Sequence, residues 1–134
     1  MQIFTIIPVY NRKNITLQFL NDLNNQTYTN FKIIVFDDGS TDGTSEAIQK
    51  EFPNIRILRG DGNYWWTKSI NASLRFAINH SADYVLLLND DIRLANNLIE
   101  TFVNNAKIKP NAIFGAANYD LSTNTLLFAG EKRN

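Results

Sequence analysis

Two acidic clusters in this sequence have the residue types of a cation site. The first is Asp37-Asp38, which follows the apolar run 31–36, and the second is Asn89-Asp90-Asp91, which follows the apolar run 84–88. Carboxylates that meet at one site repel each other unless a cation or hydrogen-bond donors lie between them. A hard divalent cation that also bridges to substrate phosphates is the natural partner of such oxygen ligands. The pattern therefore predicts a site for a divalent cation and a phosphorylated ligand, provided that the two clusters meet.

The simpler interpretation of an aspartate behind a strand is a helix cap or a turn former. This interpretation suits Asp42, because a helical pattern begins directly after it. Two acidic pairs at two strand ends, each ahead of a helix, favour a functional role for Asp38 and Asp91 instead.

The elements that must position these clusters alternate between strands and helices. Short apolar runs predict strands at 3–9, 31–36, 55–58, 84–88, 113–117 and 126–129. Apolar positions at helical spacing predict helices around 15–23 and 47–52, and over 66–78 and 94–108. Alternation of this kind indicates βαβ units, hence an α/β fold with a mostly parallel sheet and helices on both faces. Ligands of such sheets bind beyond the carboxyl ends of the strands, which is where both acidic clusters lie.

Composition narrows the class of protein. A length of 134 residues fits one domain, and 13 basic residues balance 13 acidic ones, which argues against nucleic acid as a partner. The absence of cysteine excludes disulfides and thiolate zinc sites. The N-terminus lacks the pattern of a signal peptide, and the longest apolar run, 84–88, is far shorter than a transmembrane segment. We therefore expect a soluble, cytoplasmic protein.

Three motifs follow one another along the chain: TIIPVYN at 5–11, VFDDGSTDGT at 35–44 and LNDD at 88–91. In this order and spacing, they make the chain resemble the family 2 glycosyltransferases of the GT-A fold. The segment 115–130 is similar to rhamnosyltransferase-like members. The likeness covers essentially the whole chain. It implies that residues 1–134 form the Rossmann-like, nucleotide-diphospho-sugar-binding part of a GT-A domain, peripheral to the inner face of the membrane.

The resemblance also implies roles for single residues. Tyr10 stacks on a pyrimidine base, and Asp38 accepts a hydrogen bond from the ring N–H of uracil or thymine, which favours a UDP- or dTDP-sugar. Asp91 ligates Mn²⁺ or Mg²⁺, and the ion neutralises the leaving diphosphate as a Lewis acid. Asp90 contacts the ribose, or the metal through water, and Lys68 reaches a phosphate. The implied donor-binding residues are Pro8, Tyr10, Asn11, Asp38, Lys68 and Asp90.

Four further residues have predicted positions or roles near these motifs. We expect Asp37 to orient its loop and Gly39 to allow a sharp turn there. Of the neighbouring pair Trp65 and Trp66, we expect one to pack into the core and the other to stack on a sugar or nucleotide. The alternative is that both pack.

The catalytic base is missing from the motifs. Inverting members of the family use a carboxylate that lies beyond the metal motif, in the acceptor-binding half of a longer domain. Glu131 is the only acidic residue in the tail 130–134, and nothing marks it as that base. We therefore expect the base beyond residue 134, in a longer enzyme of which this chain is the N-terminal part.

The predicted function is metal-dependent, inverting transfer of a sugar from a UDP- or dTDP-sugar to a saccharide or lipid-linked acceptor. One alternative is a noncatalytic nucleotide-binding or interaction module of the same fold. A phosphoacceptor receiver domain is disfavoured, because its acidic pair would follow the first strand, where this chain has Pro8-Val9-Tyr10. A nucleotidyltransferase would need a glycine-rich basic loop at the same place.

Overall fold

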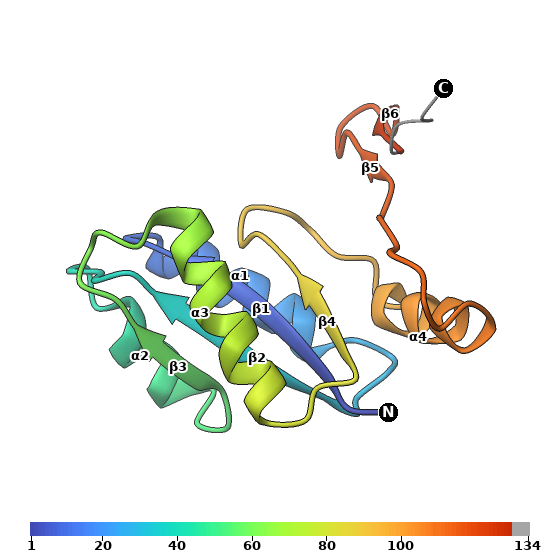
Figure 1. Cartoon of the computed structure of the whole chain (residues 1–134). Coiled ribbons are helices and arrows are strands. Elements are labelled where there is room, and N and C mark those ends of the chain that lie inside the picture. Colours follow the sequence, from blue (N-terminus) through green and yellow to red (C-terminus); the bar gives the residue numbers. More distant parts are fainter. Residues whose placement is uncertain (130–134) are drawn as a thin grey trace. The chain divides into compact units, whose positions relative to one another are not determined.

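The computed structural model describes residues 1–129, and Figure 1 colours its elements along the chain. The chain divides into two compact units, Met1–Ile99 and Glu100–Asn134. The first unit contains a parallel sheet with three helices, and the second contains most of a fourth helix and a short hairpin. Glu131 lies outside the described residues.

The first unit is built on a four-stranded parallel sheet in the order β3-β2-β1-β4. Its strands are β1 (Ile3–Val9), β2 (Phe31–Asp37), β3 (Arg56–Arg59) and β4 (Tyr84–Leu87). In register, Val9 lies opposite Asp37, and Asp37 lies opposite Arg59, so three strands end at one level. The fourth strand ends opposite Ile6. The segment that follows β4 therefore starts beside the last residues of β1.

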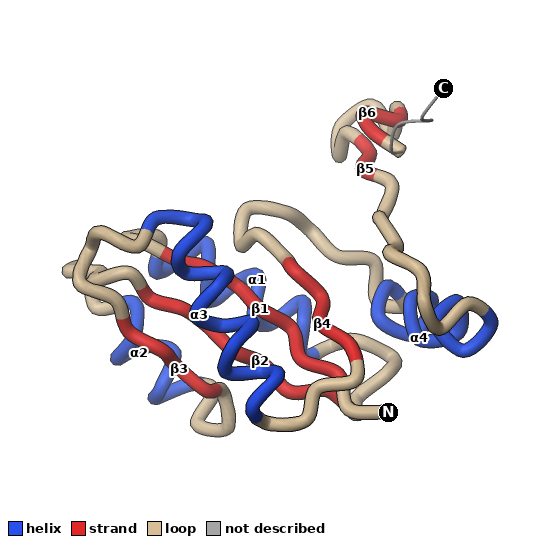
Figure 2. The backbone as a smooth tube through the Cα atoms, in the orientation of Figure 1, coloured by secondary structure: helices blue, strands red, loops and turns tan. Residues whose placement is uncertain are grey.

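Helices cover both faces of this sheet. Figures 1 and 2 show α3 (Trp65–Asn79) on one face, and α1 (Lys13–Asn24) and α2 (Thr44–Glu51) on the other. The predicted α/β fold, with a parallel sheet between two helical layers, is confirmed. In the described part of the chain, no helix has both the length and the apolar character needed to span a membrane.

The core explains why the strands read as continuous apolar runs. Phe4, Ile6 and Ile34 are buried in one cluster with Ile70 and Ala77 of α3. Alternate residues of the same strands point to the opposite face of the sheet. There, Ile7 and Val35 are fully buried, as are Phe19, Leu20, Leu23 and Ile48 on α1 and α2. Strands covered on both faces carry apolar residues at every position instead of every second one.

The predicted helix over 94–108 starts four residues too early, because α4 spans Leu98–Ile108. The residues of the predicted first turn make hydrogen bonds to another loop instead. The carbonyl oxygens of Ala95 and Asn96 accept hydrogen bonds from the Gln26 side chain and the Thr27 backbone N–H, at 2.9 and 2.8 Å. These carbonyls bond across to the α1–β2 loop, so residues 95 and 96 do not begin a helix.

In the second unit, the predicted strand over 113–117 is wrong. This unit instead forms a hairpin of β5 (Asn118–Tyr119) and β6 (Leu126–Phe128), close to the predicted last strand. Ile113 is fully exposed, and no strand within residues 1–129 pairs with 113–117. An apolar run without a partner strand does not form a sheet.

In the hairpin turn between β5 and β6, hydrogen bonds from Ser122 and Thr123 lower the pKa of Asp120 to about 2.

Candidate functional site

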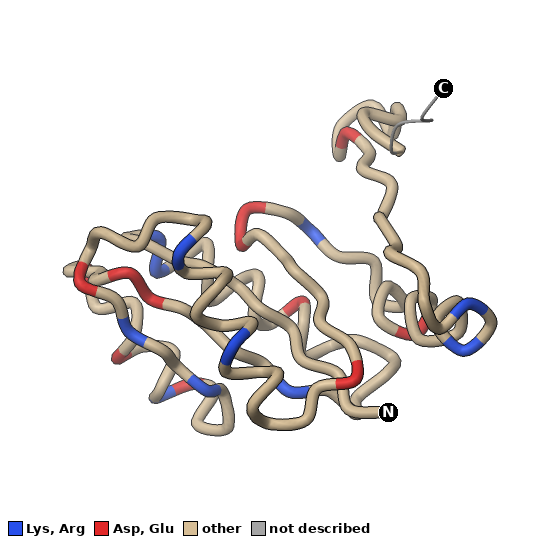
Figure 3. The backbone as a smooth tube through the Cα atoms, in the orientation of Figure 1, with Lys and Arg blue, Asp and Glu red and all other residues tan. Residues whose placement is uncertain are grey.

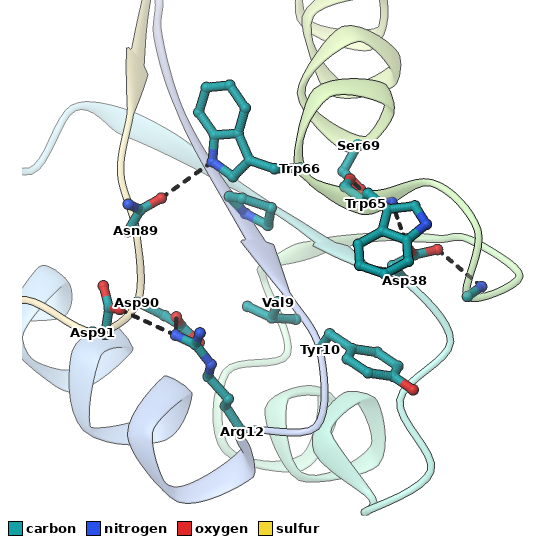
Figure 4. Close-up of a pocket in the computed structure, with 12 residues that line it drawn as sticks. Val9, Tyr10, Arg12, Asp38, Trp65, Trp66, Ser69, Asn89, Asp90 and Asp91 are labelled. Carbon is teal, nitrogen blue, oxygen red and sulfur yellow. Dashed lines mark hydrogen bonds and ion pairs between the residues drawn. The ribbon is translucent and has the colours of Figure 1, made fainter.

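A pocket of about 490 Å³ opens in the first unit where β1, β2 and β4 end and α3 begins. Figure 4 shows its side chains converging from these four elements. Five residues that the sequence predicted for a ligand site line this pocket together: Pro8, Tyr10, Asp38, Asp90 and Asp91. The other lining residues are Val9, Arg12, Gly62, Trp65, Trp66, Ser69 and Asn89.

Asn11 does not line the pocket, although the sequence predicted it as a donor-binding residue. Its side-chain oxygen accepts a hydrogen bond from the Thr41 backbone N–H at 2.7 Å, and its own N–H donates to the Ser40 hydroxyl at 2.9 Å. It adopts a left-handed conformation, with φ of 49°, which asparagine tolerates better than most residues. Asn11 therefore ties the loop after β1 to the loop after β2.

Lys68 does not line the pocket either, and its predicted contact with a phosphate stays a prediction. It lines a separate depression with Asp61, Asn63 and Arg75, among others. On α3, the residues that line the pocket are Trp65, Trp66 and Ser69, and Lys68 lies outside the arc that these three residues span around the helix axis.

Asp42 joins the starts of two helices. Its carboxylate accepts hydrogen bonds from the Lys13 N–H at the start of α1, at 2.9 Å, and from the Thr44 N–H and hydroxyl at the start of α2, at 3.0 and 2.5 Å. The bond from the Thr44 hydroxyl, followed by that from Lys13, lowers the pKa of Asp42 below its usual 3.8. The capping function predicted for this residue agrees with these contacts.

We expect Asp42→Ala to lower the free energy of unfolding by about 1 kcal/mol at pH 7, the usual size of a lost cap. Because the folded-state pKa is lowered, the stabilisation is complete above the unfolded pKa of about 3.8 and is lost as the pH falls through the folded value. Urea unfolding of both proteins at pH 7 and at pH 2.5 measures this difference. A gap between the two proteins that is equally large at both pH values would contradict the assignment.

Asp38 shapes the other side of the pocket. Its buried carboxylate accepts three backbone hydrogen bonds, from Gly62 at 2.9 Å, Tyr64 at 3.0 Å and Trp65 at 2.8 Å. Trp65 has φ of 52°, a left-handed conformation that is uncommon for a bulky residue. Such strain persists only where surrounding contacts over-determine it, and the Asp38 carboxylate supplies two of those contacts at the start of α3.

The loops after β2 and β3 pack closely because of Gly39. Its φ is 77°, and a Cβ atom at this position would lie 2.9 Å from the Gly62 backbone nitrogen. Asp37 holds the same turn, since its carboxylate accepts hydrogen bonds from the Ser40 N–H, at 2.8 Å, and from the Ser45 hydroxyl. The geometry agrees with the sequence predictions for both residues.

Trp65 and Trp66 correct a prediction, because neither indole packs into the core. Their exposed fractions are 77% and 54%, and both line the pocket. The Trp66 indole N–H donates to the Asn89 side-chain oxygen at 3.3 Å, which links α3 to the segment after β4. The first buried residues of α3 come later, at Ser69 and Ile70. The two indoles therefore give the pocket apolar walls next to its carboxylates.

Arg12 is the charged pocket residue that the sequence analysis did not predict. One of its terminal nitrogens lies 3.1 Å from a carboxylate oxygen of Asp90 and 3.3 Å from one of Asp91. The Asp90 side chain is almost fully buried and also accepts a hydrogen bond from the Thr16 hydroxyl at 2.8 Å, whereas Asp91 is half exposed. The signal lay in the strand order. In this doubly wound order, β4 lies beside β1, so the segments that follow the two strands meet.

A divalent ion in this pocket would need phosphate oxygens of a bound nucleotide, or water, to complete its coordination shell. Among residues 1–129, no group of three or more His, Cys, Asp or Glu side chains is placed to hold a metal. Mg²⁺ is commonly bound through one or two carboxylates, with phosphates and water completing the shell. Asp91, which is half exposed at the pocket, fits this mode, with Asp90 beside it.

Comparison with known proteins gives a family and several relatives. The family model described as glycosyl transferase family 2 matches residues 4–132. The glycosyltransferase GlyG of Streptococcus pneumoniae is 27% identical over 131 residues, which cover 94% of this chain and 42% of GlyG. An N-acetylglucosaminyl-diphospho-decaprenol L-rhamnosyltransferase of Mycobacterium tuberculosis is 25% identical over 71% of this chain and 34% of that protein. The chain thus spans less than half the length of these relatives.

Solved structures share the architecture. S. aureus TarS 1-349 in complex with UDP-GlcNAc superimposes with a TM-score of 0.72 at 24% identity, over 81% of this chain and 32% of that one. The mannosyltransferase PcManGT of Pyrobaculum calidifontis, in complex with GDP-Man and Mn²⁺, gives 0.65 at 23% identity, over 78% and 31%. At these identities the likeness shows the fold.

Proposed function

The chain belongs to glycosyl transferase family 2, and from this membership we propose that it binds the donor of a metal-dependent, inverting sugar transfer that uses a UDP- or dTDP-sugar. The family match bears out the resemblance drawn from the three sequence motifs. One observation carries the proposal. Tyr10, Asp38 and Asp91, from the ends of three strands, line a single pocket. The aromatic face of Tyr10 suits a nucleobase, and the buried carboxylate of Asp38 suits the ring N–H of that nucleobase. The exposed carboxylate of Asp91 suits a metal ion bound to the diphosphate.

We propose that the nucleobase stacks on Tyr10, a residue that is 56% exposed and lines the pocket. A carboxylate has about four lone-pair sites, and three backbone N–H groups bind to Asp38. One acceptor position is left for the ring N–H of uracil or thymine. The UDP-GlcNAc complex of TarS supports a uridine donor. The GDP-Man complex of PcManGT is a reason to test guanine as well, because guanine also carries a ring N–H.

Asp91 is the proposed ligand of Mn²⁺ or Mg²⁺, with Asp90 beside it. The bound ion would supply Lewis-acid neutralisation of the leaving diphosphate. The Mn²⁺ in the PcManGT complex supports this proposal. Thr16 and Arg12 fix the Asp90 carboxylate, and we propose that its remaining lone pairs orient the ribose or a metal-bound water.

The acceptor and the catalytic base are proposed to involve residues beyond 134. The relatives are more than twice as long as the matched region, which leaves room for an acceptor-binding part. We propose a saccharide or lipid-linked acceptor, and a cytoplasmic enzyme peripheral to the inner face of the membrane. In this scheme the chain itself positions the donor, and a carboxylate elsewhere removes the acceptor's proton.

Titration calorimetry with UDP, dTDP, GDP and ADP, each with and without Mn²⁺, tests the proposal. We expect UDP and dTDP to bind at least about tenfold more tightly than ADP in the presence of Mn²⁺. This follows because adenine lacks the ring N–H that Asp38 would accept, and an unpaired buried acceptor costs roughly 1–3 kcal/mol. Equal affinity for all four nucleotides would contradict the base assignment. Binding of UDP or dTDP with Mn²⁺, without sugar transfer to any acceptor, would favour a noncatalytic nucleotide-binding module.

A further inference from the structure

Arg12 occupies the space between the two carboxylates assigned to the metal and the donor. A single guanidinium nitrogen contacts both, at 3.1 Å from Asp90 and 3.3 Å from Asp91. The Arg12 side chain is itself about half exposed and lines the pocket (Figure 4). No other ion pair of Arg12 is recorded among residues 1–129. The cation that paired carboxylates require is therefore already present as a side chain.

A charge count shows what this arrangement does to a metal ion. Arg12, Asp90 and Asp91 together carry one net negative charge at neutral pH. A divalent ion alone would turn this into one net positive charge, next to a guanidinium that cannot lose its proton. The two negative charges of a nucleotide diphospho-sugar would restore a net charge of minus one. Without Arg12, by contrast, the carboxylate pair and a divalent ion would neutralise each other with no nucleotide present.

We propose that Arg12 is the counter-ion that makes metal binding at Asp91 depend on the donor diphosphate. The inference rests on the proposed metal function of Asp91. Arg12 pairs with Asp91, so a metal ion must compete with Arg12 for this carboxylate. When the diphosphate is present, its negative charges stabilise both cations. Metal and diphosphate then bind as a coupled pair, and the coupling is reciprocal because both affinities belong to one thermodynamic cycle.

The contacts of Arg12 require its positive charge but not the planar shape of its guanidinium group. Both carboxylates contact the same nitrogen atom, so neither contact is a bidentate fork. A lysine ammonium, which is a point charge on a flexible stem, supplies such a contact. Arg12→Lys should therefore retain the coupling, and Arg12→Gln should lose it.

The experiment measures Mn²⁺ binding to the chain with and without UDP, by titration calorimetry and by the electron paramagnetic resonance signal of free Mn²⁺. We expect Arg12→Gln to bind Mn²⁺ alone about tenfold more tightly than the parent, and to lower the factor by which UDP raises Mn²⁺ affinity about tenfold. Arg12→Lys should match the parent within about threefold. Arg59→Gln is the matched control, because Arg59 also pairs with one exposed carboxylate, that of Glu46, but lies outside the pocket.

Three results would overturn the proposal in different ways. If Arg12→Gln keeps the parental Mn²⁺ affinity and coupling, while Asp91→Ala loses the coupling, Arg12 is not the counter-ion and the metal function of Asp91 stands. If UDP binds to the parent without any dependence on Mn²⁺, the metal function fails and the Arg12 proposal fails with it. Failure of Arg12→Lys to restore the parental behaviour would also count against a charge mechanism.

Discussion

Asp38→Asn is expected to lower the free energy of unfolding by about 2–3 kcal/mol and to abolish nucleotide binding, since hydrogen bonds to a charged group contribute about 1.5–3 kcal/mol. The asparagine amide has one acceptor oxygen, whereas the N–H groups of Gly62, Tyr64 and Trp65 approach both carboxylate oxygens. In either amide orientation, at least one N–H would face an NH₂ group. The left-handed conformation of Trp65 would then lose part of what holds it.

Denaturant unfolding and UDP titration measure the two effects of Asp38→Asn. Asp61→Asn is a suitable control, because Asp61 lies in the loop after β3 whose N–H groups bind to Asp38. The Asp61 carboxylate accepts one recorded hydrogen bond, from the Asn63 N–H at 3.0 Å, and an amide oxygen can accept it equally well. Intrinsic tryptophan fluorescence reports the loop directly, because both tryptophans lie at the pocket. Parental stability together with parental UDP affinity in Asp38→Asn would remove Asp38 from the site.

The parts of this fold that were predictable from sequence are those that depend on local pattern. The run 3–9 and residues 34–36 of the second run are largely buried on both faces of the sheet, and this makes their apolar character continuous and easy to recognise. Acidic residues at the ends of parallel strands predicted Asp38 and Asp91 as one group, because all such strands end at the same edge, and the family resemblance added Tyr10. No property of distant segments was needed for either prediction.

Three of the failures involve partners that are distant in sequence. The turn at 95–96 depends on donors from Gln26 and Thr27. Either Trp65 or Trp66 was expected in the core, but both indoles lie open to the pocket, and Asp38 holds the Trp65 backbone in that position. Arg12 became visible only when the strand order placed it beside Asp90. In each case the deciding contact joins residues 27 or more positions apart, and local composition carries no information about such contacts.

The metal assignment makes the second large prediction. Asp91→Ala is expected to remove the dependence of UDP binding on Mn²⁺, reducing a coupling of about 5- to 150-fold to none. Asp91 is exposed and its recorded contact is with Arg12, so its loss leaves no buried group unsatisfied. We therefore expect the stability to change by less than about 0.5 kcal/mol, as for most surface substitutions. A loss of the coupling between Mn²⁺ and UDP, without a loss of stability, would identify Asp91 as a metal ligand and not as a residue that the fold requires.

Glu46→Ala is the matched control for Asp91→Ala. Both variants remove one exposed carboxylate that pairs with a single arginine, but Glu46 pairs with Arg59 outside the pocket. UDP titrations at several Mn²⁺ concentrations should therefore coincide for Glu46→Ala and the parent. Metal-independent affinity of Asp91→Ala should also match that of the parent or exceed it, since Arg12 would lose one of its two carboxylates and be freer to pair with a phosphate. An Mn²⁺ dependence that survives in Asp91→Ala would place the ion on other ligands, and Asp90 would be the next residue to test.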